Sequence, residues 1–495
     1  MKLQVRGLPP LVPATPTPGG ARWAVGVVAA LVVVGLVLRV LHLGTGLWFD
    51  EIQTLVDYVR SPLGTIVTNY DNTNQHLFYS VLARISTTLL GESGAALRLP
   101  AALLGTASLL AFYLLAIRVT GRVEALLGTA LLTFSYHHVW FSQNARGYSG
   151  LLLFTLLATA AFLRLLSERD AGWGAVAAYG ISVALGAYLH PLAILVPIAH
   201  GLVLVVLWWR VRRTAPEAGW RPAAGILVGA LLTLVLYTPV LSQVFGTLTG
   251  PNPAAAETVW KSPLWMLKET ISVLGTGLPG GWLSVVVAGL VCITGLASYG
   301  RQSAAVAAML VLPGLLTASV ILALNHNLWP RFFFFSAGFA ILIAMRGGFV
   351  ISRAMFRQRG NPVAVAGAVL VIIASALTVP RAWRPKQDFE GARDFVERTR
   401  APGDAVVTVS LTTYPYTQWL GRDWIDLGTV EQLKAVERSH THTWLLYTFP
   451  IRLRTMLPGI WKRLTVAYDT AAVYPGTIGG GDIVVMKFRP EPPSP

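Results

Sequence analysis

The chain has 495 residues, of which 54% are hydrophobic and 13% are charged, and its mean hydropathy is +0.58. This composition excludes an ordinary soluble protein, and apolar runs along the first 380 residues predict a polytopic α-helical membrane protein. The formal net charge of +16 does not indicate nucleic-acid binding, because the basic residues are spread over short loops between apolar runs. The single cysteine, Cys292, excludes a disulfide framework and a thiolate metal site.

Eleven apolar runs are long enough to cross a bilayer as helices. They cover residues 23–43, 97–117, 123–140, 149–166, 173–189, 191–209, 223–243, 282–298, 304–324, 332–350 and 362–380. Residues 1–22, which are rich in Pro and Gly, are predicted to be a disordered cytoplasmic tail. The fifth and sixth runs meet at His190-Pro191, which indicates either a tight outer turn or one broken helix.

The distribution of Lys and Arg predicts the orientation, because short loops rich in these residues face the cytoplasm. One such loop holds Arg210, Arg212, Arg213 and Arg221. This orientation places the first outer loop, residues 44–96, outside a multi-pass cell-membrane domain that spans residues 23–380. Within that loop, Ile52 to Val67 and Leu77 to Leu90 are amphipathic and are predicted to form interfacial helices. The Trp-rich stretch 245–281 is predicted to form another interfacial structure on the same side.

Residues 381–495 have frequent charges and short β-rich runs, which predict a small extracytoplasmic α/β domain. A helix is expected over 389–400, and strands are expected over 405–409, 443–448 and 483–488. Gly479-Gly480-Gly481 precedes a strand and lacks the helix that a phosphate-binding glycine loop must open, so it does not indicate a nucleotide site.

The stretch Gly46-Leu47-Trp48-Phe49-Asp50-Glu51 places two adjacent carboxylates just after the first predicted span. These acids could cap the helix expected from Ile52, because a carboxylate there accepts backbone N–H bonds. One of them could instead act as a general base or a metal ligand at a cavity near the outer leaflet. Asp50 and Glu51 are therefore the candidate catalytic residues.

Other polar residues gather in loops on the same predicted side of the membrane. The run Asn69 to Tyr79 offers amides, an acid and an imidazole that suit sugar hydroxyls or phosphate oxygens, unless it is a solvated loop with a helix cap. Arg146 and Arg331 could each bind an anionic substrate, although an arginine beside a bilayer can also reach lipid phosphate. The candidate substrate-binding residues are Arg39, Asp71, Gln75, His76, Tyr79, Gln143, Asn144, Arg146, Tyr148, His190, His326 and Arg331.

Residue types that bind divalent metals occur at several of these positions, but they lack the spacing of a helical metal-binding motif. We predict no particular cofactor and leave a divalent metal open. The residues that could supply ligands are Asp50, Glu51, Asp71, His76, His138 and His326.

Several of these segments resemble motifs of the GT-C membrane glycosyltransferases, close to the bacterial dolichyl-phosphate-mannose-protein mannosyltransferase-like group and the lipid A aminoarabinose transferase. Arg39 followed by Gly46 to Glu51 resembles the acidic motif of the first loop in that group. Ser142-Gln143-Asn144-Ala145-Arg146-Gly147-Tyr148 resembles its SQEARxY motif, with Asn144 where Glu is common, and His76-Leu77-Phe78-Tyr79 resembles its HPPLYY motif without the two prolines. Arg331 and the aromatic residues after it resemble the RY segment of a later span in that group, and Glu390 to Asp404 resembles the start of its extracytoplasmic domain.

This resemblance implies an inverting sugar transfer from a polyprenyl-phosphate-linked donor to a glycan, lipid or protein acceptor of the cell envelope. It implies that Asp50 is the general base, that Arg146 and Arg331 stabilise the leaving phosphate, and that His76 is a further donor. Two other classes remain open. A transporter or flippase for a lipid-linked sugar would use similar cations without a base, and a noncatalytic assembly protein would use its C-terminal domain for binding.

Overall fold

The computed structural model describes residues 21–168, 171–213, 219–250, 258–277 and 280–489. Residues 1–20 of the expected N-terminal tail lie outside this set. The chain forms two compact units, which we call the helical unit and the C-terminal unit. The helical unit comprises Met1–Leu43, Leu63–Gly91 and Ala96–Ala382, and the C-terminal unit comprises Gly44–Pro62, Glu92–Ala95 and Trp383–Pro495. The first outer loop is thus divided between the two units.

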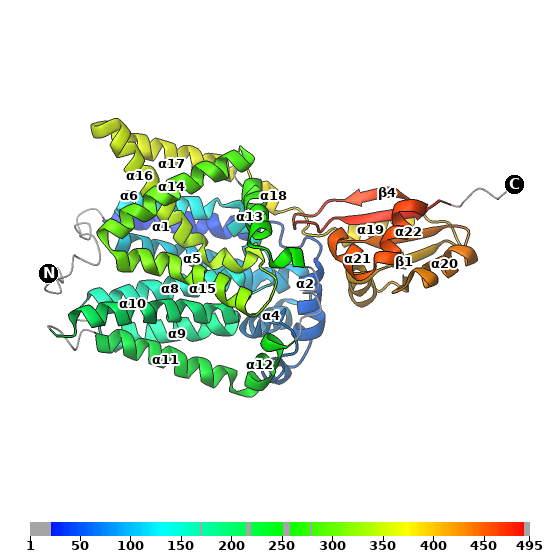
Figure 1. Ribbon diagram of the computed structural model, residues 1–495, viewed down its shortest axis with the longest axis horizontal. Helices are drawn as coiled ribbons and strands as arrows, with labels where there is room; N and C mark the ends of the chain where they lie inside the picture. Colours follow the sequence, from blue (N-terminus) through cyan, green and yellow to red (C-terminus); the bar gives the residue numbers. More distant parts are fainter. Residues whose placement is uncertain (1–20, 169–170, 214–218, 251–257, 278–279, 490–495) are drawn as a thin grey trace. The chain divides into compact units, whose positions relative to one another are not determined.

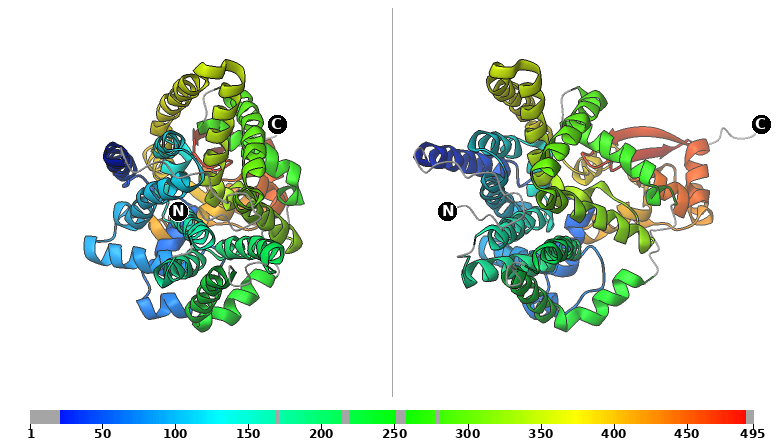
Figure 2. Two further views of the ribbon diagram at one scale, coloured as in Figure 1. Left: turned by 90° about the vertical axis from the view of Figure 1, so that its left-hand side faces the viewer. Right: turned by 60° about the vertical axis from the view of Figure 1, so that its left-hand side comes forward.

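The helical unit consists of long apolar helices and short helices at their ends (Figure 1). Its elements are α1 (Ala21–Val40), α3 (Leu63–Thr68), α4 (Leu77–Leu90), α5 (Gly94–Val119), α6 (Arg122–Thr133), α7 (Tyr136–Ser142), α8 (Tyr148–Ser167), α9 (Trp173–Leu189), η2 (Pro191–Ile194), α10 (Leu195–Val211), α11 (Trp220–Tyr237), η4 (Thr238–Val240), α12 (Leu241–Thr249), η6 (Thr258–Lys261), α13 (Pro263–Gly277), α14 (Gly281–Gln302), α15 (Ala304–Ala323), η7 (Pro330–Ser336), α16 (Ala337–Phe356), η8 (Arg357–Arg359), α17 (Gly360–Ala376) and α18 (Val379–Ala382). The left panel of Figure 2 views α1, in dark blue, nearly along its axis at the rim of this unit.

Eight stretches of the described residues are long and apolar enough to cross a membrane, by length and composition only. One of them, Pro330–Ala382, contains both α16 and α17, and α9 is a shorter apolar helix. The predicted helix over 123–140 is wrong, because α6 ends at Thr133 and α7 begins at Tyr136. Ser135 starts α7 by accepting a hydrogen bond from the backbone N–H of His138 at 3.4 Å. The expected number of eleven spans therefore stays a prediction.

Several other expectations are confirmed. The predicted helix over 77–90 is α4, with the same ends. The turn between the fifth and sixth runs is confirmed, since His190 has an extended backbone (φ −159°, ψ 125°) and residues of both α9 and α10 line one pocket. The stretch Ile52 to Val67 is not one helix, because Pro62 cannot donate a backbone hydrogen bond and the chain breaks there before α3.

Helix contacts in this unit depend on small residues and on one buried ion-pair cluster. A Cβ atom on Gly347 of α16 would lie 2.0 Å from the carbonyl oxygen of Val291 in α14, so only glycine permits this close approach. In the first turn of α6, the buried carboxylate of Glu124 pairs with Arg346 at 3.2 Å and with Arg353 at 3.0 Å. These ion pairs join α6 to α16.

The C-terminal unit contains a five-stranded mixed sheet with strand order β2-β1-β3-β5-β4. Strand β1 pairs in parallel with β2 and β3, whereas β5 pairs antiparallel with β3 and β4. The elements are α2 (Phe49–Gln53), the π-helix η1 (Thr54–Val59), α19 (Phe389–Thr399), β1 (Ala405–Thr408), η9 (Ser410–Thr412), the π-helix η10 (Pro415–Trp419), β2 (Ile425–Asp426), α20 (Val430–Ser439), β3 (Thr443–Tyr447), α21 (Pro450–Met456), α22 (Pro458–Ala467), β4 (Tyr468–Tyr474) and β5 (Ile483–Phe488). The predicted helix and three strands are confirmed to within one residue at each end.

Both faces of this sheet are covered, because side chains alternate along the strands. Leu445 of β3 packs in a core with Leu433 of α20 and Leu464 of α22. The next side chain toward the N-terminus, Trp444, points to the opposite face and meets Phe395 of α19, with ring centroids 6.2 Å apart. The unit is thus a three-layer α/β structure.

Candidate functional site

Three aromatic side chains from distant parts of the sequence meet in the helical unit. His76 precedes α4, Tyr148 begins α8, and His190 lies in the turn between α9 and η2. The ring centroids of His76 and His190 are 4.9 Å apart, and each lies 5.5 Å from the centroid of Tyr148. All three residues are buried. We call them the His76 cluster.

The hydrogen bonds of His76 define which ring nitrogen carries the proton. Its Nδ1 lies 2.9 Å from the carbonyl oxygen of Leu189, and a carbonyl oxygen can only accept, so Nδ1 donates. In the neutral ring, Nε2 is then the acceptor. This atom is buried and has no hydrogen-bond partner among the described residues.

Gly147 allows His76 to take this position. A Cβ atom there would lie 2.6 Å from Nδ1 of His76 and 2.8 Å from the carbonyl oxygen of Leu189. No larger residue fits without displacing the imidazole. The only signal for this role in the sequence is the place of Gly147 between Arg146 and Tyr148.

Two arginines carry positive charge to the cluster. The guanidinium carbon of Arg146, which is 3% exposed, lies 5.8 Å from the ring centroid of Tyr148. The guanidinium carbon of Arg331 lies 5.9 Å from the centroid of Phe332, whose ring is 6.2 Å from that of His190. Burial, followed by the charges of Arg146 and His190, holds the pKa of His76 well below its ordinary value. His76 is therefore neutral near pH 7, with Nε2 available as an acceptor.

The remaining predicted residues on the helices join elements together. The guanidinium of Arg39 is wholly buried, donates to the carbonyl oxygen of Gly35 at 2.7 Å, and bonds to Nδ1 of His138. Gln143 donates to the carbonyl oxygens of Arg39 at 3.1 Å and of Leu41, where α1 ends. Arg39 and Gln143 thus link α1 to α7 and the segment that follows it.

Two residues of the first loop also bond to the backbone. Tyr79 donates to the carbonyl oxygen of Leu97 at 2.8 Å, and Gln75 donates to that of Asn69 at 2.8 Å. These bonds fix both ends of the segment that carries His76.

Three further candidates differ in their exposure to solvent. Asp71 is exposed, His326 is half-buried, and Asn144 is buried.

The two acidic candidates belong to the C-terminal unit, where they begin α2. Glu51 is fully buried, and its carboxylate accepts a hydrogen bond from the backbone N–H of Trp48 at 3.4 Å. Glu51 thus has the capping role that the sequence offered for both acids. Asp50 is half-buried, and its carbonyl oxygen accepts a hydrogen bond from the hydroxyl of Thr54 at 2.7 Å.

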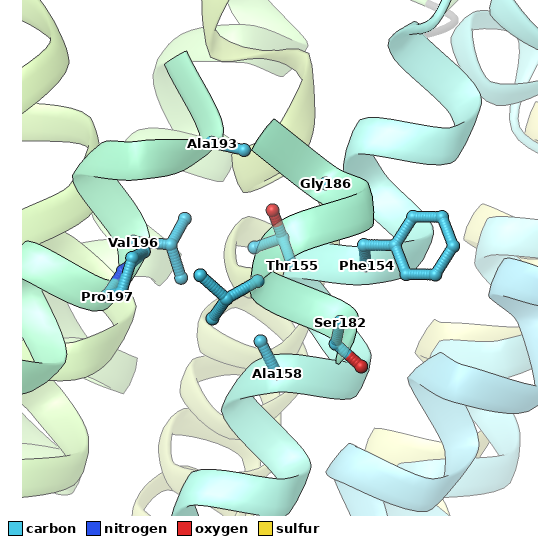
Figure 3. Close-up of a pocket in the computed structure, with 9 residues that line it drawn as sticks. Phe154, Thr155, Ala158, Ser182, Gly186, Ala193, Val196 and Pro197 are labelled. Atoms are coloured by element: carbon cyan, nitrogen blue, oxygen red, sulfur yellow. The ribbon is translucent and has the colours of Figure 1, made fainter. Parts of the chain in front are cut away.

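The described residues contain no group of three or more His, Cys, Asp or Glu side chains that could hold a metal ion. A small apolar pocket lies between α8, α9 and α10 (Figure 3). It is lined by Thr155, Ser182 and Ala193 among others, and it includes none of the candidate site residues. The His76 cluster, with its two arginines, is thus the main concentration of candidate residues in the helical unit.

Residues 75–242 match a family model described as dolichyl-phosphate-mannose-protein mannosyltransferase. No curated protein sequence matches the chain. Among solved structures, the chain is similar to ArnT from Cupriavidus metallidurans bound to undecaprenyl phosphate, with a TM-score of 0.55 and 14% identity over 95% of this chain and 98% of that chain.

The chain is also similar to the archaeal oligosaccharyltransferase AglB from Archaeoglobus fulgidus in complex with an inhibitory peptide and a dolichol-phosphate. The TM-score is 0.53, with 12% identity over 94% of this chain and 74% of that chain. The resemblance to the GT-C membrane glycosyltransferases is confirmed. The chain is a multi-pass membrane protein with a GT-C-like fold and a small C-terminal sheet. The matched segment, residues 75–242, includes His76, Arg146, Tyr148 and His190.

Proposed function

We propose that this GT-C chain is an inverting glycosyltransferase that moves a sugar from a polyprenyl-phosphate-linked donor to a cell-envelope glycan, lipid or protein. The observation that supports this proposal best is the His76 cluster beside Arg146 and Arg331. Fixed cations and a buried acceptor suit a ligand that contains both a phosphate and hydroxyl groups.

The leaving group in this reaction is a lipid phosphate. As the bond between the anomeric carbon and the phosphate oxygen breaks, the phosphate takes the electron pair and its negative charge grows. Arg146 and Arg331 stabilise that charge, because cationic groups that the fold already holds in place need little reorganisation when it develops. The undecaprenyl phosphate bound to ArnT and the dolichol-phosphate bound to AglB support a donor of this class.

His76 contributes an acceptor instead of a positive charge. Its Nδ1 is occupied by the carbonyl oxygen of Leu189, and Nε2 of the neutral ring can accept a hydrogen bond from a hydroxyl group of the sugar. This role differs from the donor role that the family resemblance implied for His76.

Asp50 is the general base of the proposed reaction. Its carboxylate takes the proton of the acceptor hydroxyl while that oxygen forms a bond to the anomeric carbon from the face opposite the phosphate, which inverts the configuration. A positioned base contributes about 100-fold to 10,000-fold to such a step. Asp50 suits this role better than Glu51, since the Glu51 carboxylate is buried and caps α2.

The proposal includes a topology. The N-terminus faces the cytoplasm, the chain crosses the membrane eleven times, and residues 381–495 lie outside, where they contribute to the choice of acceptor. The excess of Arg in one set of loops supports this orientation. Deletion of residues 381–495 with no change in acceptor preference would contradict the role of that domain.

The test is the transfer of radiolabelled sugar from polyprenyl-phosphate-sugar donors to cell-envelope acceptors, in membranes that hold the wild type or Asp50→Asn at equal amounts. We expect label transfer by the wild type and loss of at least about 100-fold in the variant. Equal transfer by both proteins would refute the base assignment. Movement of the lipid-linked sugar across intact vesicles without any transfer would favour a flippase.

A further inference from the structure

The chain segment that carries Asp50 is held by a buried amide of the C-terminal unit. Gln387 lies just before α19 and is fully buried. Its Oε1 accepts a hydrogen bond from the backbone N–H of Phe49 at 3.1 Å, and its Nε2 donates to the hydroxyl of Thr448 at 3.1 Å. One side chain therefore connects the residue before Asp50 to the residue that follows β3.

This connection matters because the first N–H groups of a helix have no acceptor within the helix. Phe49 is the first residue of α2, and Gln387 supplies the acceptor that its N–H requires. Glu51 accepts from the preceding N–H, that of Trp48. The backbone on both sides of the Phe49 amide is thus fixed before the chain reaches Asp50.

Further contacts within the unit hold the same segment. The ring of Tyr414 lies 5.9 Å from that of Phe49, and its hydroxyl donates to the carboxylate of Asp57 in η1. A Cβ atom on Gly46 would lie 3.4 Å from the carboxyl carbon of Glu390 in α19, so the chain passes close to that helix. Of the residues outside the segment named here, Gln387 is the one that hydrogen-bonds to the backbone N–H of the residue before Asp50, through a part-buried bond.

We propose that Gln387 is a positioning residue, which orients the general base by holding the first turn of α2 to the end of β3. The proposal rests on the proposed function, because it takes Asp50 as the base. It also gives the C-terminal unit a role beyond acceptor choice, since that unit then orders part of the catalytic machinery.

The test uses the full-length protein and two variants of Gln387. Gln387→Met keeps the size of the side chain and removes both hydrogen bonds. Gln387→Glu keeps an acceptor for the N–H of Phe49, and the hydroxyl of Thr448 can turn to donate to it. Glu437→Gln is the matched control, because Glu437 is buried in the same unit and bonds to Arg463 and Tyr468 instead of α2.

The first measurement is amide hydrogen exchange of the peptide that covers residues 44–53. We expect exchange about tenfold faster in Gln387→Met, and exchange close to that of the wild type in Gln387→Glu and Glu437→Gln. Unchanged exchange in Gln387→Met would overturn the proposal, whatever the role of Asp50.

The second measurement is sugar transfer, run beside Asp50→Asn. We expect kcat of Gln387→Met to fall about 10-fold to 100-fold, with KM for the donor within about twofold of the wild type, and we expect rescue by Gln387→Glu. Full activity of Gln387→Met beside an inactive Asp50→Asn would overturn the positioning role alone. Full activity of Asp50→Asn would instead overturn the base assignment.

Thr448→Val keeps the test decisive if Gln387→Met does not fold. This variant removes only the acceptor for Nε2 and leaves the bond to Phe49 in place. We expect a fall in kcat of about threefold to tenfold with faster exchange of residues 44–53. No change in either quantity would overturn the proposal.

Discussion

Replacement of Gly147 by alanine tests whether the position of His76 matters for the reaction. The new Cβ atom would lie 2.6 Å from Nδ1 of His76, whereas ordinary contact begins at 3.4 Å, so the ring must move by about 0.8 Å (3.4 minus 2.6). The carbonyl oxygen of Leu189, at 2.8 Å, is part of the backbone and cannot yield easily. The bond from His76 to Leu189 would therefore lengthen or break.

The expected result of Gly147→Ala is a fall in kcat/KM of about 100-fold, because a misplacement of about 1 Å at a reacting group has an effect of that size. Overpacking should also lower the free energy of unfolding by about 1 to 3 kcal/mol. The assay is sugar transfer by purified protein, with thermal unfolding measured on the same samples.

The matched control is Gly246→Ala in α12, where a new Cβ atom would meet no atom within 4 Å. Its transfer rate should stay within about twofold of the wild type, since exposed helix positions tolerate alanine. Full activity of Gly147→Ala would refute the view that His76 must occupy this position.

Three further predictions address charge and stability. Arg331→Lys should lower kcat by about tenfold and Arg331→Ala by about 100-fold or more, because lysine keeps the charge but loses the planar donor fork. The measurement is sugar transfer at saturating donor, and equal rates for both variants would contradict a phosphate contact. The folded protein holds His76 neutral, whereas the same side chain binds a proton in the unfolded chain below about pH 6.5. The free energy of unfolding should therefore decrease as pH falls below about 6.5, and His76 accounts for at most about 1.4 kcal/mol of this decrease per pH unit. His76→Gln should therefore show a shallower fall in thermal stability between pH 7 and pH 5 than the wild type, and parallel curves would refute this. Glu124→Gln should lower the free energy of unfolding by up to about 3 kcal/mol, because it removes the buried partner of Arg346, and an unchanged Tm would show that the ion pair contributes little.

Several features of the fold follow from local sequence patterns. Most of the apolar runs, the amphipathic stretch Leu77 to Leu90 and the β-rich runs of the C-terminal domain predict their element within a few residues, because hydrophobic periodicity is a local property. The break between α6 and α7 was missed, since the run is apolar throughout and only the hydroxyl of Ser135 marks the new helix. His76, Arg146 and Tyr148 are recognisable as candidates, because placing a polar side chain beside a bilayer costs free energy and usually indicates a functional role.

Only the tertiary structure decided how these candidates are used. His76 and Leu189 are 113 positions apart, and no local pattern shows that their hydrogen bond makes Nε2 an acceptor. Arg39 and Gln143 are substrate-ligand candidates by sequence, but the terminal guanidinium nitrogens of Arg39 and the amide nitrogen of Gln143 bond to backbone carbonyl groups and to His138. Gln387 gave no signal at all, because its bond to Phe49 spans 338 positions. The sequence by itself determined which residues can donate, accept or carry charge, and long-range packing determined their partners, because a hydrogen bond depends on proximity in space and not on separation along the chain.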